Sequence, residues 1–358
     1  MHSLIGFGPA NYAGQAHAWA EAVRAHEGVP STSFTFRPLP RGLARTTTFG
    51  FESDHLLPNP RLPLPGSARR AERYLNTLSH LFLDGFVNPF RGPGGELSEV
   101  ISRRDSQGLF TALIAHGTEL RSPDLHRQNN DWSYFAHVDD EWLAAVRAGV
   151  ARTQAILATH PGTPLLVSTP DLLQDAPDAT WLPLALPPRR PRLPATPGSP
   201  RPGPKDGRLR VLHVPSRRRP AIKGTEFVDP VLHRLDAEGM VDYVSPEWVP
   251  HDEMDGLMAS CDVVIDQLLT GSYGVTALEA MRAGCVVIGN LNDFVRAQVD
   301  VPVPIVDANP ETLREVVLSL RDRTRLTDLR DAGHRFVKEV HDGRRSAKVI
   351  TECADLAR

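Results

Sequence analysis

The sequence has few of the features that mark secreted, membrane-spanning or nucleic-acid-binding proteins. It contains only 3 cysteines in 358 residues, an odd number that does not suggest a disulfide framework. No window approaches the roughly 18 apolar residues of a membrane span, and the N-terminus lacks a charged segment followed by an apolar one. The formal net charge of −3 creates no field that would recruit nucleic acid. We expect a cytoplasmic protein with buried, reduced thiols, and a peripheral contact with a membrane surface stays open.

Several motifs for nucleotides and metals are also missing. Neither half of the chain contains the P-loop pattern G-x-x-x-x-G-K-[ST], so a P-loop is excluded. The N-terminal glycines Gly6, Gly8 and Gly14 do not have the G-x-G-x-x-G spacing, and the strand-like run 34–36 is followed by Arg37 instead of an acidic residue. A nicotinamide oxidoreductase is therefore poorly supported. No cysteines and histidines have the spacing of a metal site, and we expect no cofactor.

What the sequence does have is the composition of a globular protein with a full core. Hydrophobic residues make up 41% and charged residues 23% of the chain. Arginines outnumber lysines by 36 to 4, a bias that points to a GC-rich bacterial genome. The length predicts two domains, and the segment 187–207, with eight prolines, divides the chain into near-equal halves. We predict domains at 1–186 and 208–345, a linker between them, and a C-terminal helix at 346–358 that packs back on the first domain.

Strands and helices alternate through both halves of the chain. Apolar runs predict strands at 3–7, 34–36, 81–86, 110–115, 164–167, 209–214, 241–244, 263–265, 285–288 and 304–306. Intervening segments predict helices, among them 15–26, 69–77, 141–157, 226–238, 251–260, 275–282 and 309–320. This alternation is typical of α/β proteins, and it predicts two Rossmann-like doubly wound domains facing a cleft.

The stretch 261–290 carries the clearest signal for a binding site. A short apolar strand ends at Asp266, a glycine-rich turn covers 270–274, and a helix follows from Val275. Gly284 is placed to end that helix before the next strand. The helix N-terminus would offer unpaired backbone N–H groups and a positive dipole end, which suit a phosphate. Glu279, one to two turns into the helix, could reach past a phosphate to a pair of sugar hydroxyls. An ordinary βαβ unit is the alternative.

Cationic and strand-end residues add to this signal. Arg217, Arg218 and Lys223 follow the strand 209–214, and facing Gly274 they would form a pyrophosphate site. Because consecutive arginines cannot all point inward, we expect one arginine together with Lys223 to do so. His116 follows the strand 110–115, at the edge where open α/β sheets bind ligands. A solvated arginine surface and a structural histidine remain the alternatives.

Together these motifs resemble retaining GT-B glycosyltransferases of family 4. The run from Glu279 to Gly284 matches the family's Glu-Ala-Met-x-x-Gly helix. The family's basic residues are similar to an arginine at 217 or 218 together with Lys223 and Gly224. Its strand-end histidine is similar to His116, and its N-terminal glycine loop is similar to the segment 8–14. The resemblance covers essentially the whole chain and is strongest over 209–310. One position departs from the family, because Gly271 stands eight positions before Glu279, where the family has another glutamate.

The resemblance implies transfer of a sugar from a nucleoside diphosphate sugar to a hydroxyl of a saccharide, lipid or natural product, with retention and without a metal. The implied catalytic residues are His116, Lys223 and Arg218. The implied donor-binding residues are Arg217, Arg218, Lys223, Gly271, Ser272, Tyr273, Gly274, Val275 and Glu279. The candidate acceptor-binding residues are Asn11, Tyr12, Gly14, Gln15, Glu119 and Arg121. Alternatives are a nucleotide-sugar epimerase or hydrolase of the same fold, and a catalytically inactive nucleotide-binding subunit, which Gly271 suggests.

Overall fold

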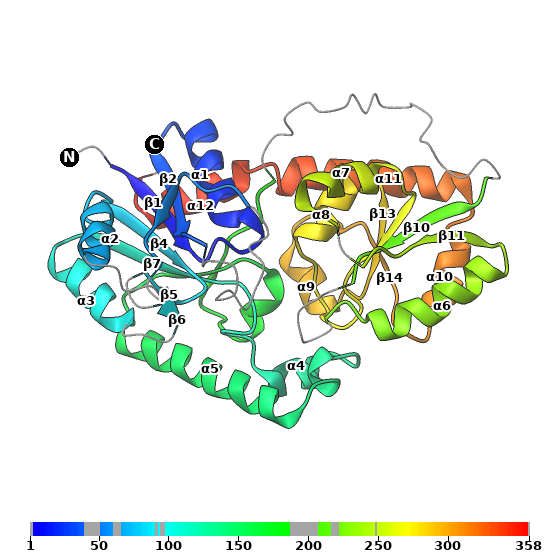
Figure 1. Cartoon of the computed structure of the whole chain (residues 1–358), viewed down its shortest axis with the longest axis horizontal. Coiled ribbons are helices and arrows are strands. Elements are labelled where there is room, and N and C mark those ends of the chain that lie inside the picture. The colour runs from blue at the N-terminus through cyan, green and yellow to red at the C-terminus, as the bar shows by residue number, and fades with distance from the viewer. Residues whose placement is uncertain are drawn as a thin grey trace. The chain divides into compact units, whose positions relative to one another are not determined.

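A computed structural model gives the structure of the protein (Figure 1). It describes residues 3–38, 51–59, 66–89, 92–93, 97–186, 207–215, 222–247 and 249–356. The chain forms two compact units, and each draws on separate parts of the sequence. The first unit contains Met1–Ser122, Ala144–Pro187 and His341–Arg358, and the second contains Pro123–Leu143 and Pro188–Val340. The segment 123–143, which we assigned to the first domain, thus belongs to the second unit. The predicted linker lies outside the described residues except for Gly207.

The first unit is built on a parallel sheet, in which the described residues form seven strands in the order β3–β2–β1–β4–β7–β8–β9. These strands are β1 (Ile5–Pro9), β2 (Ser31–Phe36), β3 (His55–Leu57), β4 (His80–Asp84), β7 (Phe110–Ala115), β8 (Leu165–Val167) and β9 (Thr180–Trp181). β5 (Val87–Asn88) and β6 (Gly92–Pro93) form a separate antiparallel pair. The sheet starts in its middle and grows outward in both directions, which is the doubly wound order of Rossmann-like folds.

Helices cover both faces of this sheet. They are α1 (Gln15–His26), α2 (Ser67–Leu75), α3 (Leu97–Ser106), α5 (Asp140–Thr159) and α12 (Arg344–Cys353), with the 3-10 turns η1 (Tyr12–Gly14) and η3 (Pro170–Gln174). Because side chains of a strand alternate, Leu81 and Leu83 enter one core with residues of α2 and α3, whereas Phe82 stacks on Phe7 at a ring distance of 5.0 Å. α12 packs against α1, so the end of the chain completes the first unit.

The second unit is built on a parallel sheet, in which the described residues form strands in the order β11–β10–β12–β13–β14. Its strands are β10 (Leu209–His213), β11 (Val241–Val244), β12 (Val263–Ile265), β13 (Val286–Gly289) and β14 (Ile305–Asp307). Its helices are α4 (Pro123–Asn129), α6 (Thr225–Ala237), α7 (His251–Ala259), α8 (Val275–Arg282), α9 (Asp293–Gln298), α10 (Leu313–Ser319) and α11 (Arg323–Val340), with the 3-10 turn η2 (Tyr134–Ala136). The residues of β12 and β13 are fully buried, which explains their uninterrupted apolar sequence.

The end of α8 confirms the role predicted for Gly284. Its φ of +78° is the left-handed conformation that glycine adopts without strain. Its N–H donates to the Met281 carbonyl at 2.9 Å, and the N–H of Cys285 donates to the Ala280 carbonyl at 2.9 Å. This pair of bonds is a Schellman motif, which ends the helix and turns the chain into β13.

The structure confirms the predicted fold class, two doubly wound α/β units with parallel sheets. The three cysteines form no disulfide, and Cys261 and Cys285 are buried in the second unit. Burial raises the pKa of the Cys353 thiol to about 11, so it stays protonated near neutral pH. In the described part of the chain, no helix is long and apolar enough to cross a membrane.

Candidate functional site

The polar residues singled out from the sequence lie at the carboxyl ends of central strands. In the second unit the strand order reverses between β10 and β12, and in the first unit it reverses between β1 and β4. Parallel α/β sheets bind ligands outside the carboxyl ends of their strands at such reversals. Each unit therefore has one edge where a ligand site is expected.

Lys223 and Asp266 flank the reversal in the second unit. Lys223 follows β10, Asp266 follows β12, and the distance between Nζ and Oδ1 is 3.2 Å. The Asp266 side chain is only 2% exposed and that of Lys223 is 14% exposed. Neither carboxylate oxygen of Asp266 has a hydrogen-bond partner among the described residues. The buried carboxylate thus holds the Lys223 ammonium at the strand ends by charge.

His213 supports this edge from inside the sheet. It is the last residue of β10 and is fully buried. Nδ1 lies 3.0 Å from the carbonyl oxygen of Ile265, so it carries the hydrogen, and Nε2 accepts from the Thr225 hydroxyl at 2.8 Å. Burial, together with the positive charge of Lys223, lowers the pKa of His213 to about 4. His213 is therefore a neutral residue that ties β10 to β12 and to the start of α6, and the sequence analysis did not single it out.

The turn 270–274 leads into α8, as predicted. Gly274 precedes the first residue of the helix, and no side chain caps the free N–H groups of the first turn. The hydroxyls of Thr270 and Ser272 are buried and have no hydrogen-bond partner in the described part of the chain. The side chain of Tyr273 packs edge-on against Phe336 at 5.9 Å, so only its backbone is available to a ligand. The turn thus gathers polar groups that a ligand could satisfy.

Glu279 lies in the second turn of α8 and is partly exposed. Burial raises the pKa of its carboxyl, although His251, Arg282 and Lys223 act in the opposite direction. Among the described residues, none forms a hydrogen bond or ion pair with this carboxylate. Its partly exposed carboxylate can therefore accept hydrogen bonds from a ligand.

Gly271 has a conformation and a neighbour that leave no room for a side chain. Its φ is +68°, and a Cβ built on it would lie 1.9 Å from Oδ1 of Asn130. The glutamate that the resemblance leads one to expect at 271 could therefore not be accommodated in this arrangement. The carboxamide of Asn130, from the segment 123–143, occupies that space.

In the first unit, His116 lies directly after β7, as predicted. Its ring stacks on Trp19 at a ring distance of 5.7 Å and meets the ring of Tyr12 edge-on at 5.3 Å. Its Nε2 is 3.7 Å from Oδ2 of Asp84 and has no hydrogen-bond partner among the described residues. The imidazole is therefore fixed by aromatic contacts and lies beside a buried carboxylate.

That carboxylate was missed in the sequence. Asp84 ends β4, is fully buried and accepts the backbone N–H groups of Ala10 and Asn11 at 2.7 Å each. It thereby fixes the loop after β1 next to His116. The signal was an aspartate directly after the apolar run 81–83, because such a residue ends a buried strand at the ligand-binding edge.

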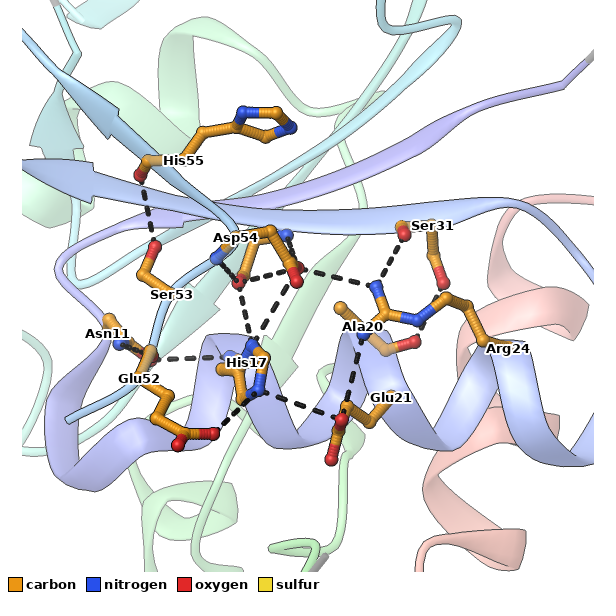
Figure 2. A network of polar contacts seen from close by, with 11 residues as sticks. Asn11, His17, Ala20, Glu21, Arg24, Ser31, Glu52, Ser53, Asp54 and His55 are labelled. Carbon is orange, nitrogen blue, oxygen red and sulfur yellow. Dashed lines mark hydrogen bonds and ion pairs between the residues drawn. The ribbon is translucent and has the colours of Figure 1, made fainter.

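Internal contacts already use several residues of the N-terminal loop. Asn11 Nδ2 donates to the Glu52 carbonyl at 2.9 Å, and its Oδ1 accepts the His17 N–H at 3.3 Å (Figure 2). The amide of Gln15 bonds the N–H and carbonyl of Ala185 at 2.9 and 3.1 Å. Gly14, with φ +75°, precedes α1. Acceptor contacts for these residues stay predictions, and the bonds of Gln15 favour a structural role.

Asp54 fastens the segment 51–59 to α1 and β2, as Figure 2 shows. Its Oδ2 accepts the N–H and hydroxyl of Ser33 at 2.7 and 2.9 Å and lies 3.3 Å from Nη1 of Arg24. His17 Nδ1 is 3.7 Å away. Burial alone would raise the pKa of Asp54, but these hydrogen bonds and charges lower it overall. The network holds this segment beside the N-terminal loop.

The remaining acceptor candidates follow β7. The backbone N–H of His116 donates to the carboxylate of Glu119. Arg121 donates through Nε and Nη2 to Oδ2 of Asp171 at 2.9 and 2.6 Å, and both side chains are buried. Of all the acceptor candidates, Tyr12 is the most open, with 40% of its surface exposed. Contacts of Glu119 and Arg121 with an acceptor stay predictions, and the ion pair favours a structural role for Arg121.

Arg217 and Arg218 lie outside the described residues, so their contacts with phosphate stay predictions. Within the described ranges, no group of three or more His, Cys, Asp or Glu side chains is arranged to hold a metal ion.

Known proteins are similar to this chain in fold rather than in sequence. No protein-family model and no curated protein sequence matches the chain. Solved structures do match it. Sucrose-phosphate synthase from Thermosynechococcus elongatus has a TM-score of 0.58 at 14% identity, over 99% of this chain and 98% of that one. Anabaena HepE, in complex with UDP and glucose, has a TM-score of 0.54 at 12% identity, over 99% of this chain and 100% of that one.

A UDP-glucosyltransferase from Polygonum tinctorium is also similar, with a TM-score of 0.51 at 11% identity over 99% of this chain and 98% of that one. Identities this low carry information about the fold alone. All three similarities span both units, and each unit has the doubly wound sheet described above. The chain has the GT-B fold of glycosyltransferases.

Proposed function

We propose that this protein is a glycosyltransferase that moves a sugar from a nucleoside diphosphate sugar to an acceptor hydroxyl, with retention at the anomeric carbon and without a metal. The fold supports the proposal, because similar structures such as HepE are complexes with UDP and with UDP-glucose. The edge of the second sheet supports it as well, since it combines a cation, a free helix N-terminus and a carboxylate without a partner. The proposal places the reaction in the cytoplasm.

Glu279 is the observation that carries the proposal. Its carboxylate is partly buried in α8, has a pKa raised by burial, and forms no hydrogen bond or ion pair with the described residues. A diphosphate at the N-terminus of α8 would lie about one turn away, because each helical turn rises about 5.4 Å. A carboxylate at that distance suits the two neighbouring hydroxyls of a ribose, from which its two oxygens can accept hydrogen bonds.

Departure of the nucleoside diphosphate develops negative charge on its phosphate oxygens. In the proposal, Lys223 and the backbone N–H groups of 273–275 stabilise that charge, with Arg218 or Arg217 as a further cation. An ammonium has three donors, so Lys223 can keep its contact with Asp266 and still donate to a phosphate. Because Lys223 and the N–H groups at the start of α8 are in place before the reaction, the proposal needs no divalent metal.

The first unit supplies the acceptor side in this proposal. His116 is a positioning and electrostatic group, held by Trp19 and Tyr12 and lying beside Asp84. Tyr12 is the loop residue most open to an acceptor. No side chain is assigned as a covalent nucleophile.

The test uses the ribose contact. Thermal shifts with UDP, ADP and GDP first identify the preferred nucleotide, and titration calorimetry then compares its ribo and 2′-deoxy forms. Wild-type protein should prefer the ribo form by about tenfold or more, because a hydrogen bond to a carboxylate is lost in the other. Glu279→Gln should remove most of that preference. The exposed Glu253 in α7 provides the matched control, Glu253→Gln, which should behave as wild type.

Two results would overturn the proposal. One is wild-type protein that binds none of the nucleotides, and the other is an equal affinity of wild type and Glu279→Gln for both forms. Incubation with the donor sugar nucleotide in the absence of an acceptor separates the alternative enzyme classes, because an epimerase or hydrolase would release an epimer or a free sugar.

A further inference from the structure

The segment 123–143 is built onto the turn that precedes α8. The N–H of Tyr134 donates to the Leu269 carbonyl at 3.0 Å. Nε2 of His126 donates to the Thr270 carbonyl at 3.0 Å, and its Nδ1 is 2.7 Å from the Ser133 hydroxyl. His126 and Ser133 are buried. The segment therefore fixes the backbone at the start of the proposed donor turn.

The same segment places Asn130 beside Gly271. Oδ1 of Asn130 accepts from Nδ2 of Asn292 at 2.9 Å, and Nδ2 of Asn130 donates to the His126 carbonyl at 2.9 Å. The backbone N–H of Asn292 donates to the Gly271 carbonyl at 3.1 Å. Two carboxamides, from segments 162 positions apart, thus fill the space that a side chain at 271 would occupy.

This pair of amides has hydrogen-bonding capacity to spare. Each Nδ2 carries two hydrogens, and in the described part of the chain each has one partner. The neighbouring hydroxyls of Thr270 and Ser272 are more than nine-tenths buried and have no partner there. Asn130 is itself only 7% exposed. Buried polar groups are nearly always satisfied, so a ligand is expected to complete this set.

The chemistry of these groups indicates the kind of ligand. All four side chains are neutral, and they donate through N–H or O–H groups. They flank Gly271, whereas the charged groups Lys223 and Asp266 lie at the adjoining strand ends. A phosphate would be expected among the cations and free helix N–H groups. An uncharged polyhydroxyl group fits the neutral set.

We propose that Asn130 and Asn292 bind the sugar of the donor nucleotide and determine which sugar is accepted. The amide N–H groups donate to sugar hydroxyl oxygens from the place that a side chain at 271 would otherwise take. This inference rests on the proposed function, since it assigns the sugar side of the same site.

The test compares a nucleotide with its sugar conjugate. Titration calorimetry measures the dissociation constants of the preferred nucleotide (UDP, ADP or GDP) and of its glucose conjugate, for wild type and for Asn130→Ala. Asn130→Asp is the second variant, because it keeps the shape of the side chain and the bond from Asn292 but loses the N–H groups. The exposed amide Gln128 in the same segment gives the control, Gln128→Ala.

Both Asn130 variants should bind the sugar nucleotide about fivefold to tenfold more weakly than wild type, while their affinity for the free nucleotide changes less than twofold. Gln128→Ala should change neither constant. Equal weakening of the binding of both ligands would show that Asn130 has a purely structural role, and unchanged dissociation constants would show that it does not contact the sugar. Either result overturns the inference while the proposed function stands. Failure of wild type to bind UDP, ADP or GDP would overturn both.

Discussion

Lys223→Met tests whether the Lys223 ammonium both stabilises the fold and binds the phosphate of a ligand. The substitution keeps most of the volume of the side chain but removes the only ion-pair partner found for Asp266 among the described residues. Asp266 is 2% exposed, and no hydrogen bond compensates either of its oxygens in the described part of the chain. An unpaired charge in that position is strongly destabilising, because little water reaches it.

The expected loss of stability follows from this burial. Breaking a buried ion pair by removing one partner costs about 3–5 kcal/mol, and the 14% exposure of Lys223 favours the lower end, about 3 kcal/mol. Lys223→Met/Asp266→Asn removes both charges, so its stability should return to within about 1 kcal/mol of wild type. Asp266→Asn alone should cost less than about 1 kcal/mol, because the Lys223 side chain is 14% exposed and its ammonium can reach water. The coupling between the two sites should therefore be about 2–4 kcal/mol, measured by urea denaturation in a double-mutant cycle.

Ligand binding separates the two roles of Lys223. If the ammonium contacts phosphate, the double variant is stable but binds nucleoside diphosphate at least about tenfold more weakly than wild type, because a charge-assisted contact is lost. Asp266→Asn alone keeps the ammonium and should retain binding. Wild-type affinity in the double variant would refute the phosphate role, and a Lys223→Met protein as stable as wild type would refute the energetic argument.

Three further substitutions or conditions have defined outcomes. Gly271→Ala should lower the stability by about 2–4 kcal/mol, because residue 271 has a positive φ and the new Cβ would contact Asn130. In an Asn130→Ala background the loss should be only about 1 kcal/mol, and thermal melts of wild type, the two single variants and the double variant measure the difference. His213 and the buried His341 have pKa values lowered to about 4 from 6.5, so the unfolded state binds more protons between these values. Stability should fall by about 2 kcal/mol for each from pH 7 to pH 5 in urea titrations, and a flat profile would contradict the burial of both. Asp54→Asn should be destabilising at pH 7, because the pKa of Asp54 is lowered in the folded protein. The difference in stability between the variant and wild type should vanish as acid protonates Asp54. A difference that persists in acid would contradict the network of Figure 2.

The sequence was sufficient for what depends on local pattern. Apolar runs located the strands, and the alternation with helices gave the doubly wound class that the structure confirms. Gly284 at the end of α8 and His116 at the end of β7 could be placed because each follows directly from its own segment. Short polar helices such as α4 (Pro123–Asn129) were missed, since seven residues give too little periodicity to recognise.

Tertiary structure alone decided which distant segments meet. Asp84 accepts backbone N–H groups from residues about seventy positions earlier, and the Asn130–Asn292 bond spans 162 positions, so neither contact leaves a local pattern. For the same reason the sequence could not show that Gly271 faces a carboxamide. It placed Gln15 and Arg121 near the right strand ends, but only the fold revealed that Ala185 and Asp171 already use their side chains. Strand ends follow from the chain's own periodicity, whereas the partner of a polar side chain depends on how the whole sheet is assembled.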